Sequence, residues 1–357
     1  MKHIFILVLL FAFASGVQAQ KPRNVILMIG DGMGQEQVHA LSLLRNDSTV
    51  HMKTFPYSGL SKTYSLSDSI TDSAAGGSAL STGKKTINGY LAVNRDSTPN
   101  ETLFEEARRY GKATGFVVSC PMTHATPAAF YAHVNNRNKS EEIAWQLLHA
   151  QLDFAVGGQS SHFNDRKDGL NLLDSLKASG YQMAYTVEEL QQVSSEKSMA
   201  ILSERKPGGV EERGDWMRIG LCKALEVLSR DRDGFVLMVE GSQIDWACHA
   251  NLFSRFAEEI IEFDDLVGMA RAFAEADGET LVIVTADHET GGMRVSPKAD
   301  RMRAKAVKNV GKYVKFTRRI HSGTPVNVFA FGPGAENFQG VMENTAIHDE
   351  ISRLMRP

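Results

Sequence analysis

Short runs of apolar residues recur along the chain, and each is long enough for one β-strand. Several runs are apolar at every position, which is typical of parallel strands in a sheet that helices cover on both faces. The stretches between them carry helical periodicity, most clearly in Leu252–Phe273, where apolar residues recur every three or four positions. The strand-like runs are Val25–Ile29, Gly115–Cys120, Phe154–Gly157, Phe235–Val239, Leu281–Thr285 and Val326–Phe331.

Strands that alternate with helices predict an α/β fold with right-handed crossovers. We expect a three-layer α/β/α sandwich around a large, mostly parallel central sheet. The chain has 357 residues, of which 43% are hydrophobic, so it has ample material for one large core. It contains no internal repeat and no low-complexity linker. Residues 20–357 are therefore predicted to form a single domain.

The first 19 residues have the pattern of a secretory signal peptide. Lys2 gives a positive start, an apolar segment follows, and Val17-Gln18-Ala19 offers a small-residue cleavage site. We therefore expect an exported protein, periplasmic or secreted, after cleavage near Ala19. The alternative is an uncleaved anchor, for which the apolar segment is short. No later stretch is apolar for long enough to span a membrane, so stable membrane insertion is not expected.

The net charge and the cysteine content argue against a nucleic-acid-binding protein and against a disulfide-dependent fold. The formal net charge is −3 and becomes −4 without Lys2, which is too mild to indicate nucleic acid as a partner. Cys120, Cys222 and Cys248 form no CxxC pair. They allow at most one disulfide with a free thiol left over, and the alternative is a thiol that packs as a small apolar residue. The fold is therefore not predicted to depend on disulfides.

Three carboxylates follow apolar runs, at the ends of predicted strands. Asp31, Glu240 and Asp287 each come just after such a run. In parallel α/β sheets, ligands bind outside the carboxyl ends of the strands. We therefore expect these acids to face one site, because solvation of loops alone would not require all three.

Histidines near these acids indicate a metal site. Asp245 and His249 are four residues apart, so both project from one face of a helical turn, as zinc ligands can. His288 directly follows Asp287, and in the turn beyond a strand both can converge on one ion. His321 precedes another apolar strand. The alternative for each residue, taken alone, is a solvated acid or an ordinary core or loop histidine.

The nucleophile candidate is Ser73, in the small-residue run "TDSAAGGSALSTG". Ser73 suits a helix N-terminus, where free N–H groups and the helix dipole stabilise anions. The helix is expected to end near Gly83, and its small residues would let it pack close to the sheet. The alternative is that Asp72 or Ser73 is a simple N-cap.

A helix start, a single arginine and a basic segment complete the set of candidate features. Thr126 precedes Pro127, a helix-start signal, and Arg137 comes eleven residues after Thr126. An arginine fork can hold two oxygens of a phosphate, although a lone arginine is usually just solvated. The segment Arg294–Ile320 holds ten Lys and Arg residues with Asp300 as its one acid. It is either a solvated face or a surface that steers anions toward the site.

In their order along the chain, these motifs resemble those of alkaline phosphatase, the two-zinc, one-magnesium phosphomonoesterase family. The resemblance extends from Asp31 to His321, nearly the whole chain after the leader. The matching motifs are "GDGMG", "TDSAAGGSALSTGKKTINGYL", "HATPAAFYAHVNNR", "VEGSQIDWACHAN", "TADHETGG" and "HSGTPV".

The resemblance implies a role for each matching residue. Ser73 matches the serine that becomes phosphorylated, and Arg137 matches the arginine that grips the phosphate. It also implies that 20–357 is a catalytic domain and that small phosphate monoesters are substrates, and a homodimer is common in the family. Because little in the expected mechanism contacts the leaving group, broad specificity for monoesters is expected. The implied metal ligands are Asp245, His249 and His321 for one zinc, Asp31, Asp287 and His288 for the second, and Asp31, Thr126 and Glu240 for magnesium.

Two positions depart from the pattern of some members. His124 is an Asp in some members, and a histidine so close to Thr126 can change which ion fills the third site. Trp246 is a Lys in some members, so a charge near the phosphate is absent at this position. The chain is also short for the family, which weakens the expectation of a dimer.

Three other functions remain as alternatives. A sulfatase would need a Cys/Ser-x-Pro-x-Arg motif, which the residues after Ser73 lack, and a phosphodiesterase would not need Arg137 for a second free oxygen. A non-catalytic protein that binds zinc or phosphate would carry a degenerate site, but no expected residue is missing. A dinucleotide-binding fold would need GxGxxG, whereas the glycines around Asp31 form GxGxG.

Overall fold

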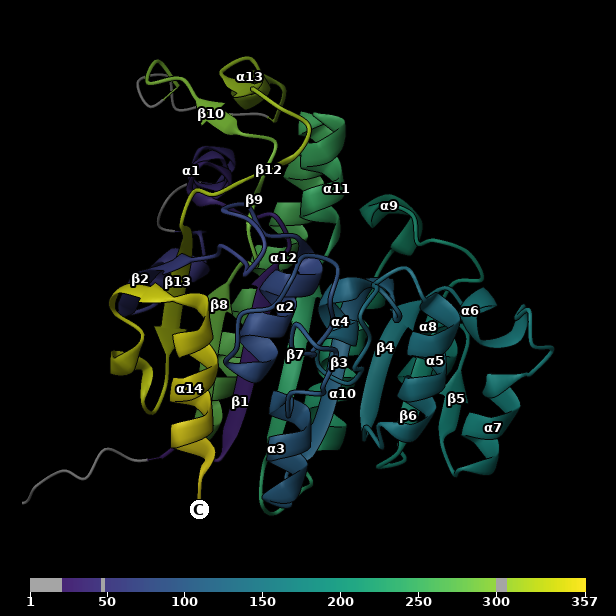
Figure 1. Ribbon diagram of the computed structural model, residues 1–357. Coiled ribbons are helices and arrows are strands. Elements are labelled where there is room, and N and C mark those ends of the chain that lie inside the picture. The colour runs from purple at the N-terminus through teal and green to yellow at the C-terminus, as the bar shows by residue number, and fades with distance from the viewer. Residues whose placement is uncertain (1–20, 46–48, 300–306) are drawn as a thin grey trace, which may run out of the picture.

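A ten-stranded sheet lies between two layers of helices in the computed structural model, which describes residues 21–45, 49–299 and 307–357 (Figure 1). Every strand runs parallel to the others except β13, which pairs antiparallel with both of its neighbours. The predicted three-layer, mostly parallel architecture is confirmed. From edge to edge the strands are β14 (Gly340–Glu343), β2 (Tyr57–Lys62), β13 (Val326–Phe331), β8 (Thr280–Thr285), β1 (Asn24–Gly30), β7 (Phe235–Gly241), β3 (Ala113–Pro121), β4 (Phe154–Gly158), β6 (Ser198–Ile201) and β5 (Gln182–Ala184).

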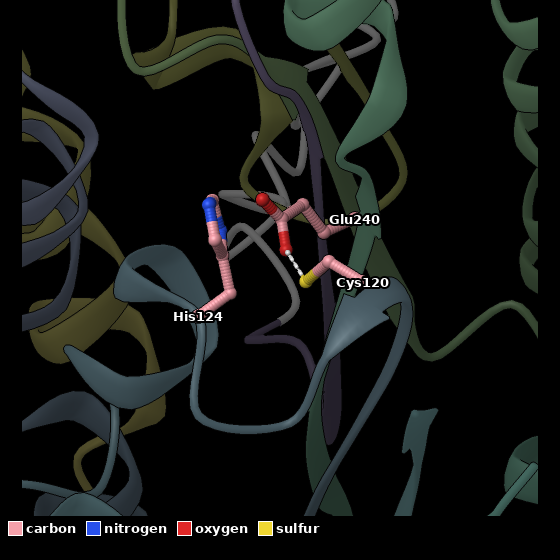
Figure 2. Close-up of side chains that lie close together, drawn as sticks. All are labelled: Cys120, His124 and Glu240. Atoms are coloured by element: carbon pink, nitrogen blue, oxygen red, sulfur yellow. Dashed lines mark hydrogen bonds between the residues drawn. The ribbon is translucent and has the colours of Figure 1, made fainter. Parts of the chain in front are cut away.

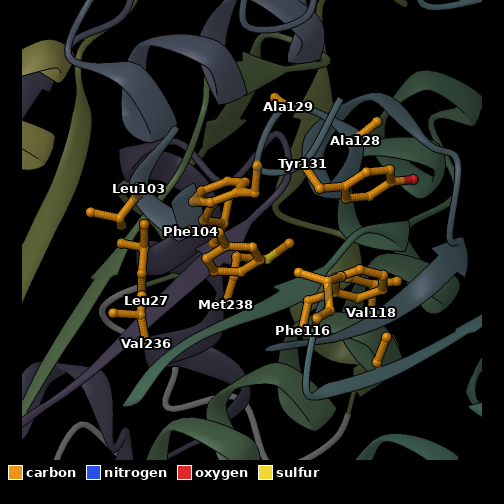
Figure 3. Close-up of a cluster of buried hydrophobic side chains, with 14 of the residues drawn as sticks. Leu27, Leu103, Phe104, Phe116, Val118, Ala128, Ala129, Tyr131, Val236 and Met238 are labelled. Atoms are coloured by element: carbon orange, nitrogen blue, oxygen red, sulfur yellow. The ribbon is translucent and has the colours of Figure 1, made fainter. Parts of the chain in front are cut away.

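One helical layer covers the face of the sheet that is nearer the viewer in Figure 1. Its apolar side chains interdigitate with those of the central strands, as Figure 3 shows for Phe104, Phe116, Tyr131 and Met238. Removing such side chains from water is the main stabilising contribution to the fold. The helices of this layer are α2 (Ser73–Thr82), α3 (Leu103–Arg109), α4 (Ala125–Ala128), α5 (Ser140–His149), α6 (Ser161–Asn164), α7 (Leu172–Ala178) and α14 (Asn344–Met355).

The opposite layer encloses a second core on the far face of the sheet. Its longest helix, α12, contains the predicted helix Leu252–Phe273 and ends at Gly278, whose φ of 68° is a left-handed cap conformation that glycine adopts without strain. The helices of this layer are α1 (Gln35–Leu44), α8 (Val187–Gln191), α10 (Trp216–Leu228), α11 (Gln243–Ala250) and α12 (Phe253–Asp277), with α9 (Val210–Arg213) and the 3₁₀ turn η2 (Met52–Thr54) beside α12.

Smaller elements lie above the carboxyl ends of the strands, at the top of Figure 1. Two short antiparallel pairs lie there, and the second carries the described part of the basic segment; its residues 300–306 lie outside the described chain. These elements are β9 (Glu289–Thr290) with β12 (His321–Ser322), β10 (Met293–Val295) with β11 (Val314–Phe316), and α13 (Val307–Gly311); the turn η3 (Ala335–Asn337) follows β13.

The register of the central strands aligns their carboxyl ends. Ile29 of β1 pairs with Glu240 of β7 on one side and with Thr285 of β8 on the other. Asp31 and Asp287 each lie two residues beyond this pairing. The sheet therefore places the three acids along one edge, as expected from their positions after apolar runs.

Three further expectations concern the signal peptide, membrane-spanning helices and the cysteines. The predicted signal peptide 1–19, with its cleavage site near Ala19, lies outside the described residues. Among the residues that are described, no helix has the length and apolarity needed to cross a membrane. Cys120, Cys222 and Cys248 are all free thiols. Cys120 and Cys248 are buried, so the expectation of at least one buried cysteine is confirmed.

Candidate active site

A buried group of ligands lies at the ends of β1 and β8. Asp31, Asp287 and His288 have ligand atoms that lie within 4.8 Å of one another, and all three residues are buried. His288 Nε2 is 3.5 Å from Asp31 Oδ1 and 3.2 Å from Asp287 Oδ2. The other oxygen of Asp287 accepts hydrogen bonds from the backbone N–H groups of Gly32 and His288, so this carboxylate has a fixed orientation.

A second group lies beside it. Asp245 and His249 come from one face of α11, and His321 comes from β12. His249 Nε2 lies 3.0 Å from His321 Nε2, and both approach Asp245 Oδ1, at 3.3 and 3.6 Å.

The tautomers of these two histidines follow from their partners. His249 Nδ1 lies 2.6 Å from the carbonyl oxygen of Arg319, and His321 Nδ1 lies 2.9 Å from that of Thr71. A carbonyl can only accept, so each Nδ1 donates its proton and Nε2 is the nitrogen whose lone pair is available to a metal. Two such lone pairs that face one carboxylate form the donor set of a zinc site.

A third group lies between β3, α4 and β7, and Figure 2 shows its side chains turned toward one another. Cys120 Sγ donates a hydrogen bond of 3.5 Å to Glu240 Oε2, and the His124 ring faces the same carboxylate. Thr126 is buried in the single turn of α4. This turn begins at Ala125, two residues before Pro127, which fits because N–H groups of the first turn have no helical acceptor.

Six buried polar atoms without hydrogen-bond partners lie in these groups. Within the described part of the chain, these atoms form no hydrogen bond, although burial of an unsatisfied polar atom is costly. Most of them are acceptors, which a cation would satisfy, so the donor set fits bound metal ions. The atoms are both oxygens of Asp31, Asp287 Oδ2, Glu240 Oε1, Thr126 Oγ1 and His124 Nδ1.

Burial and mutual repulsion shift the pKa values of the site carboxyls. Burial, and then the charges of Asp287 and Asp245, raise the pKa of Asp31 well above its ordinary value. Burial and the charge of Asp245 raise the pKa of Asp287 to about 8, and burial raises the pKa of Glu240 to about 7. Carboxylates so close together are stable as anions only beside compensating positive charge.

The two histidines that face these acids are shifted the other way. Burial and the nearby Arg137 guanidinium lower the pKa of His124 to about 3. Burial and the neighbouring His321 lower the pKa of His288 well below its ordinary value. Both rings are therefore neutral and can act as metal ligands.

Ser73 opens α2 beside the buried group. Its Oγ lies 3.3 Å from His288 Nε2. Asp72 is the N-cap, and one of its oxygens accepts from Ala75 N–H, while the other accepts from Gly89 N–H and from Arg137 Nη1, each at 3.0 Å. Asp72 therefore fixes both the helix that carries Ser73 and the guanidinium of Arg137.

The helix α2 packs as closely as its small residues predict, and it ends at Gly83. A Cβ at Gly76 would lie 3.0 Å from the backbone oxygen of Asp287, and one at Gly77 would lie 3.3 Å from Thr126 Cα. Larger residues would push the helix away from the ligand groups.

Sequence reasoning missed three residues that the structure brings into the site. Thr290 Oγ1 donates to Asp245 Oδ1 and lies 3.2 Å from His288 Nδ1, so it connects two ligand groups. Cys120 is part of the third group, and a buried strand cysteine gives no sequence signal for this. Lys206 lies with its ammonium 3.5 Å from the centroid of the Trp246 ring, and no motif marks it.

Comparison with known proteins places the chain in a family. The family model described as "Alkaline phosphatase" matches residues 22–314. Alkaline phosphatase 4 of Bacillus subtilis is 30% identical, over 94% of this chain and 89% of that protein. The alkaline phosphatase of the Antarctic bacterium TAB5 has a similar solved structure, with 38% identity, a TM-score of 0.87, and coverage of 95% of this chain and 99% of that one.

A solved His-to-Asp variant of the TAB5 enzyme, with Mg bound in its M3 site, aligns equally well, at 38% identity and a TM-score of 0.86 over 95% of this chain and 99% of that one. The family model covers most of the chain, and the structural likeness extends over nearly all of it. The chain belongs to the alkaline phosphatase family of phosphomonoester hydrolases.

Proposed function

We propose that this chain is an exported phosphatase of broad specificity that transfers the phosphate of small monoesters to Ser73 and then to water. The observation that carries the proposal is the position of Ser73: its Oγ lies at the N-terminus of α2, 3.3 Å from a buried ligand group and close to Arg137. Attack by this oxygen on phosphorus forms the Ser73–phosphate bond and breaks the ester bond, and the alcohol leaves. Water then breaks the Ser73–phosphate bond, which releases inorganic phosphate and restores the hydroxyl.

The residues around Ser73 support this role. Arg137 has one guanidinium nitrogen held by Asp72, and its planar fork can hold two oxygens of a phosphate. The free N–H groups at the start of α2 favour an anion in front of Ser73. A monoester has two free oxygens for such a fork, which favours monoesters over diesters. Each of these groups is assigned to the phosphate and none to the leaving group, so we expect broad specificity.

We propose two zinc ions, one at each of the two groups that combine aspartate with histidine. Asp245, His249 and His321 would hold one zinc. Asp31, Asp287 and His288 would hold the other. When bound, such cations lower the pKa of a hydroxyl that they touch and neutralise the charge of the phosphate.

The third site has donors of two kinds. Oxygens of Asp31, Thr126 and Glu240 suit the magnesium that the resemblance implies. Cys120 and His124 add a sulfur and a nitrogen donor to the same group, and these suit zinc. We propose that this mixed site binds zinc in preference to magnesium. The His-to-Asp variant of the TAB5 enzyme supports this, because the structure with magnesium in the M3 site is that of a protein in which Asp replaces a histidine.

The test uses the purified, metal-loaded protein. We expect two to three bound ions per chain by elemental analysis, hydrolysis of p-nitrophenyl phosphate that a chelator abolishes, and slower hydrolysis of the bis-ester. Ser73→Ala should reduce turnover by at least roughly 1,000-fold, as removal of a nucleophile does. Unchanged hydrolysis by the variant would exclude Ser73 as the nucleophile, and faster turnover of the bis-ester would favour a diesterase.

A further inference from the structure

Lys206 lies on the loop between β6 and α9, far in sequence from every ligand of the site. Its Nζ lies 3.5 Å from the centroid of the Trp246 ring. Trp246 directly follows Asp245 in α11, so the ammonium lies over a residue next to a candidate metal ligand. Stacking on an indole face is the strongest cation–π arrangement available to a lysine.

The loop that carries Lys206 is anchored on both sides. Before Lys206, the carbonyl oxygens of Ser203 and Glu204 accept from the backbone N–H groups of Ser160 and Ser161. After it, Gln243 Nε2 donates to the carbonyl oxygen of Gly208 at 2.7 Å. Gln243 is the first residue of α11. The loop is thereby bound to the same helix that carries Asp245 and Trp246, and Lys206 is held over the site.

A continuous series of contacts connects Lys206 to the phosphate-binding groups. The Trp246 ring meets the His124 ring edge-on, with centroids 5.7 Å apart. His124 Nε2 lies 3.5 Å from Arg137 Nη2. Arg137 in turn is held by Asp72, the residue before Ser73. Lys206 and Arg137 therefore lie on the same side of the site, separated by two rings.

No acidic side chain of the described residues forms an ion pair with Lys206. Within the described chain it forms no ion pair or hydrogen bond, and its contact is the neutral Trp246 ring. The preceding residue, Arg205, is exposed and has Glu204 at 3.6 Å. Partial desolvation and the charge of Arg255 lower the pKa of Lys206, while the charge of Asp245 acts in the opposite direction. The ammonium is thus within electrostatic reach of the ligand groups.

We propose that Lys206 is a substrate-binding residue that supplies a positive charge to the phosphate group bound beside Ser73, with Trp246 as the surface that positions it. The proposal rests on the proposed phosphomonoesterase function and adds a residue to it. A compact ammonium at the rim of the site attracts a dianion without fixing its orientation, and Arg137 provides the orientation.

The test measures how tightly inorganic phosphate binds to the metal-loaded protein. Lys206→Ala should weaken phosphate binding by about 5-fold, the size expected for one partly solvated charge. Lys206→Arg, which keeps the charge, should remain within about 2-fold of the parent. Arg205→Ala is the matched control, because it removes the same charge from the same loop at a residue that does not contact Trp246. It should leave phosphate binding unchanged.

Two further readouts separate positioning from general electrostatics. The weakening of phosphate binding by added salt should be smaller in Lys206→Ala than in Arg205→Ala, because a charge that attracts the bound anion has been removed. In a double-mutant cycle with Trp246→Leu, the two substitutions should be less than additive, since loss of the ring also displaces the ammonium. Additive effects would exclude Trp246 as the positioning surface.

Calorimetric titration with phosphate keeps this test independent of turnover. A parent that binds phosphate but does not hydrolyse p-nitrophenyl phosphate would overturn the proposed function and leave the role of Lys206 to be decided by the variants. A parent that hydrolyses the ester, together with equal phosphate affinities in Lys206→Ala and Arg205→Ala, would overturn the role of Lys206 alone. Metal content measured on each variant excludes loss of the ions as the cause.

Discussion

Asp31 is the one acid assigned to two of the proposed cation sites, which distinguishes it from the other ligands. It lies in the buried group with Asp287 and His288, and both of its oxygens lack a hydrogen-bond partner among the described residues. We expect Asp31→Asn to disturb the second and third cation sites together, lowering the metal content by about two ions per chain, because an amide is a weaker ligand and carries no charge. Elemental analysis of the purified variant measures this.

His249→Ala provides the comparison for Asp31→Asn, because its ring belongs to one group only. It should lower the metal content by about one ion. Loss of a single ion in Asp31→Asn, equal to that in His249→Ala, would contradict a bridging role for Asp31.

We expect His124 to determine whether the third site prefers zinc or magnesium. Its Nδ1 is a buried atom without a hydrogen-bond partner in the described chain, and its neutral ring is beside Cys120 and Glu240. We expect His124→Asp to replace zinc by magnesium there, since a carboxylate favours the harder ion. Competition dialysis with both metals, followed by elemental analysis, measures the exchange. A parent that already holds magnesium in preference to zinc would exclude the proposed selectivity.

At the scale of the element, prediction succeeded where burial is complete. Val25–Ile29 and Phe235–Val239 are apolar throughout because helices cover both faces of their strands. The strands β2, β5, β6 and β14 were not predicted: β5 and β6 are short, and β2 and β14 are half exposed at one edge, so no continuous apolar run marks them.

Some residues of the candidate site could be predicted from the sequence and others could not. Acids directly after buried strands, and an Asp and a His four residues apart on one helical face, can be located from spacing alone. Lys206 could not be located, since its loop has no periodicity and only the folded chain brings it to Trp246. Thr290 could not be recognised either, because its contacts with Asp245 and His288 depend on how β9 packs beside α11.

The close packing of α2 makes a prediction at this scale. In Gly76→Ala, the new Cβ would lie 3.0 Å from the backbone oxygen of Asp287 and 3.1 Å from its Cβ, so helix and strand end must separate. We expect kcat/KM to fall by up to roughly 10-fold, because the contact requires a movement of only a few tenths of an ångström, whereas a shift of about 1 Å at catalytic groups costs roughly 100-fold. Steady-state kinetics with p-nitrophenyl phosphate measures this.

The matched control for Gly76→Ala is Gly209→Ala, where the nearest atom to the new Cβ is Glu259 Oε1 at 3.7 Å. It should leave kcat/KM unchanged. Equal kinetics in both variants would show that α2 tolerates the extra methyl group and that its spacing is not critical.

For the whole molecule, the ligand groups connect elements that are distant in the sequence. They join the ends of β1, β7 and β8 to α11 and β12. The ions proposed here would therefore act as cross-links of the folded chain as well as catalytic groups, since ligands that bind the native state stabilise it. Stability and metal loading are expected to change together.

The raised pKa values determine how the stability of the metal-free protein depends on pH. The pKa of Asp287 is raised from 3.8 to about 8 and that of Glu240 from 4.5 to about 7. A raised pKa means that the folded state binds the proton of the carboxyl more tightly than the unfolded state does. The resulting contribution to the free energy of unfolding is fully present below about pH 4 and is lost as the pH rises to about 8. We expect the titration of Asp287 and Glu240 to make the metal-free protein less stable as the pH rises across this range.

Metal ions reverse this trend, because they bind the ionised carboxylates and compete with protons. The difference in thermal midpoint between metal-loaded and chelator-treated protein should therefore grow from pH 5 to pH 8. Scanning calorimetry at several pH values in this interval measures it. Asp287→Asn, which cannot ionise, serves as the control and should weaken the pH dependence of the metal-free form, while Glu240 still titrates. A difference that stays constant with pH would mean that these buried carboxyls are already ionised without metal, and that burial does not control their titration.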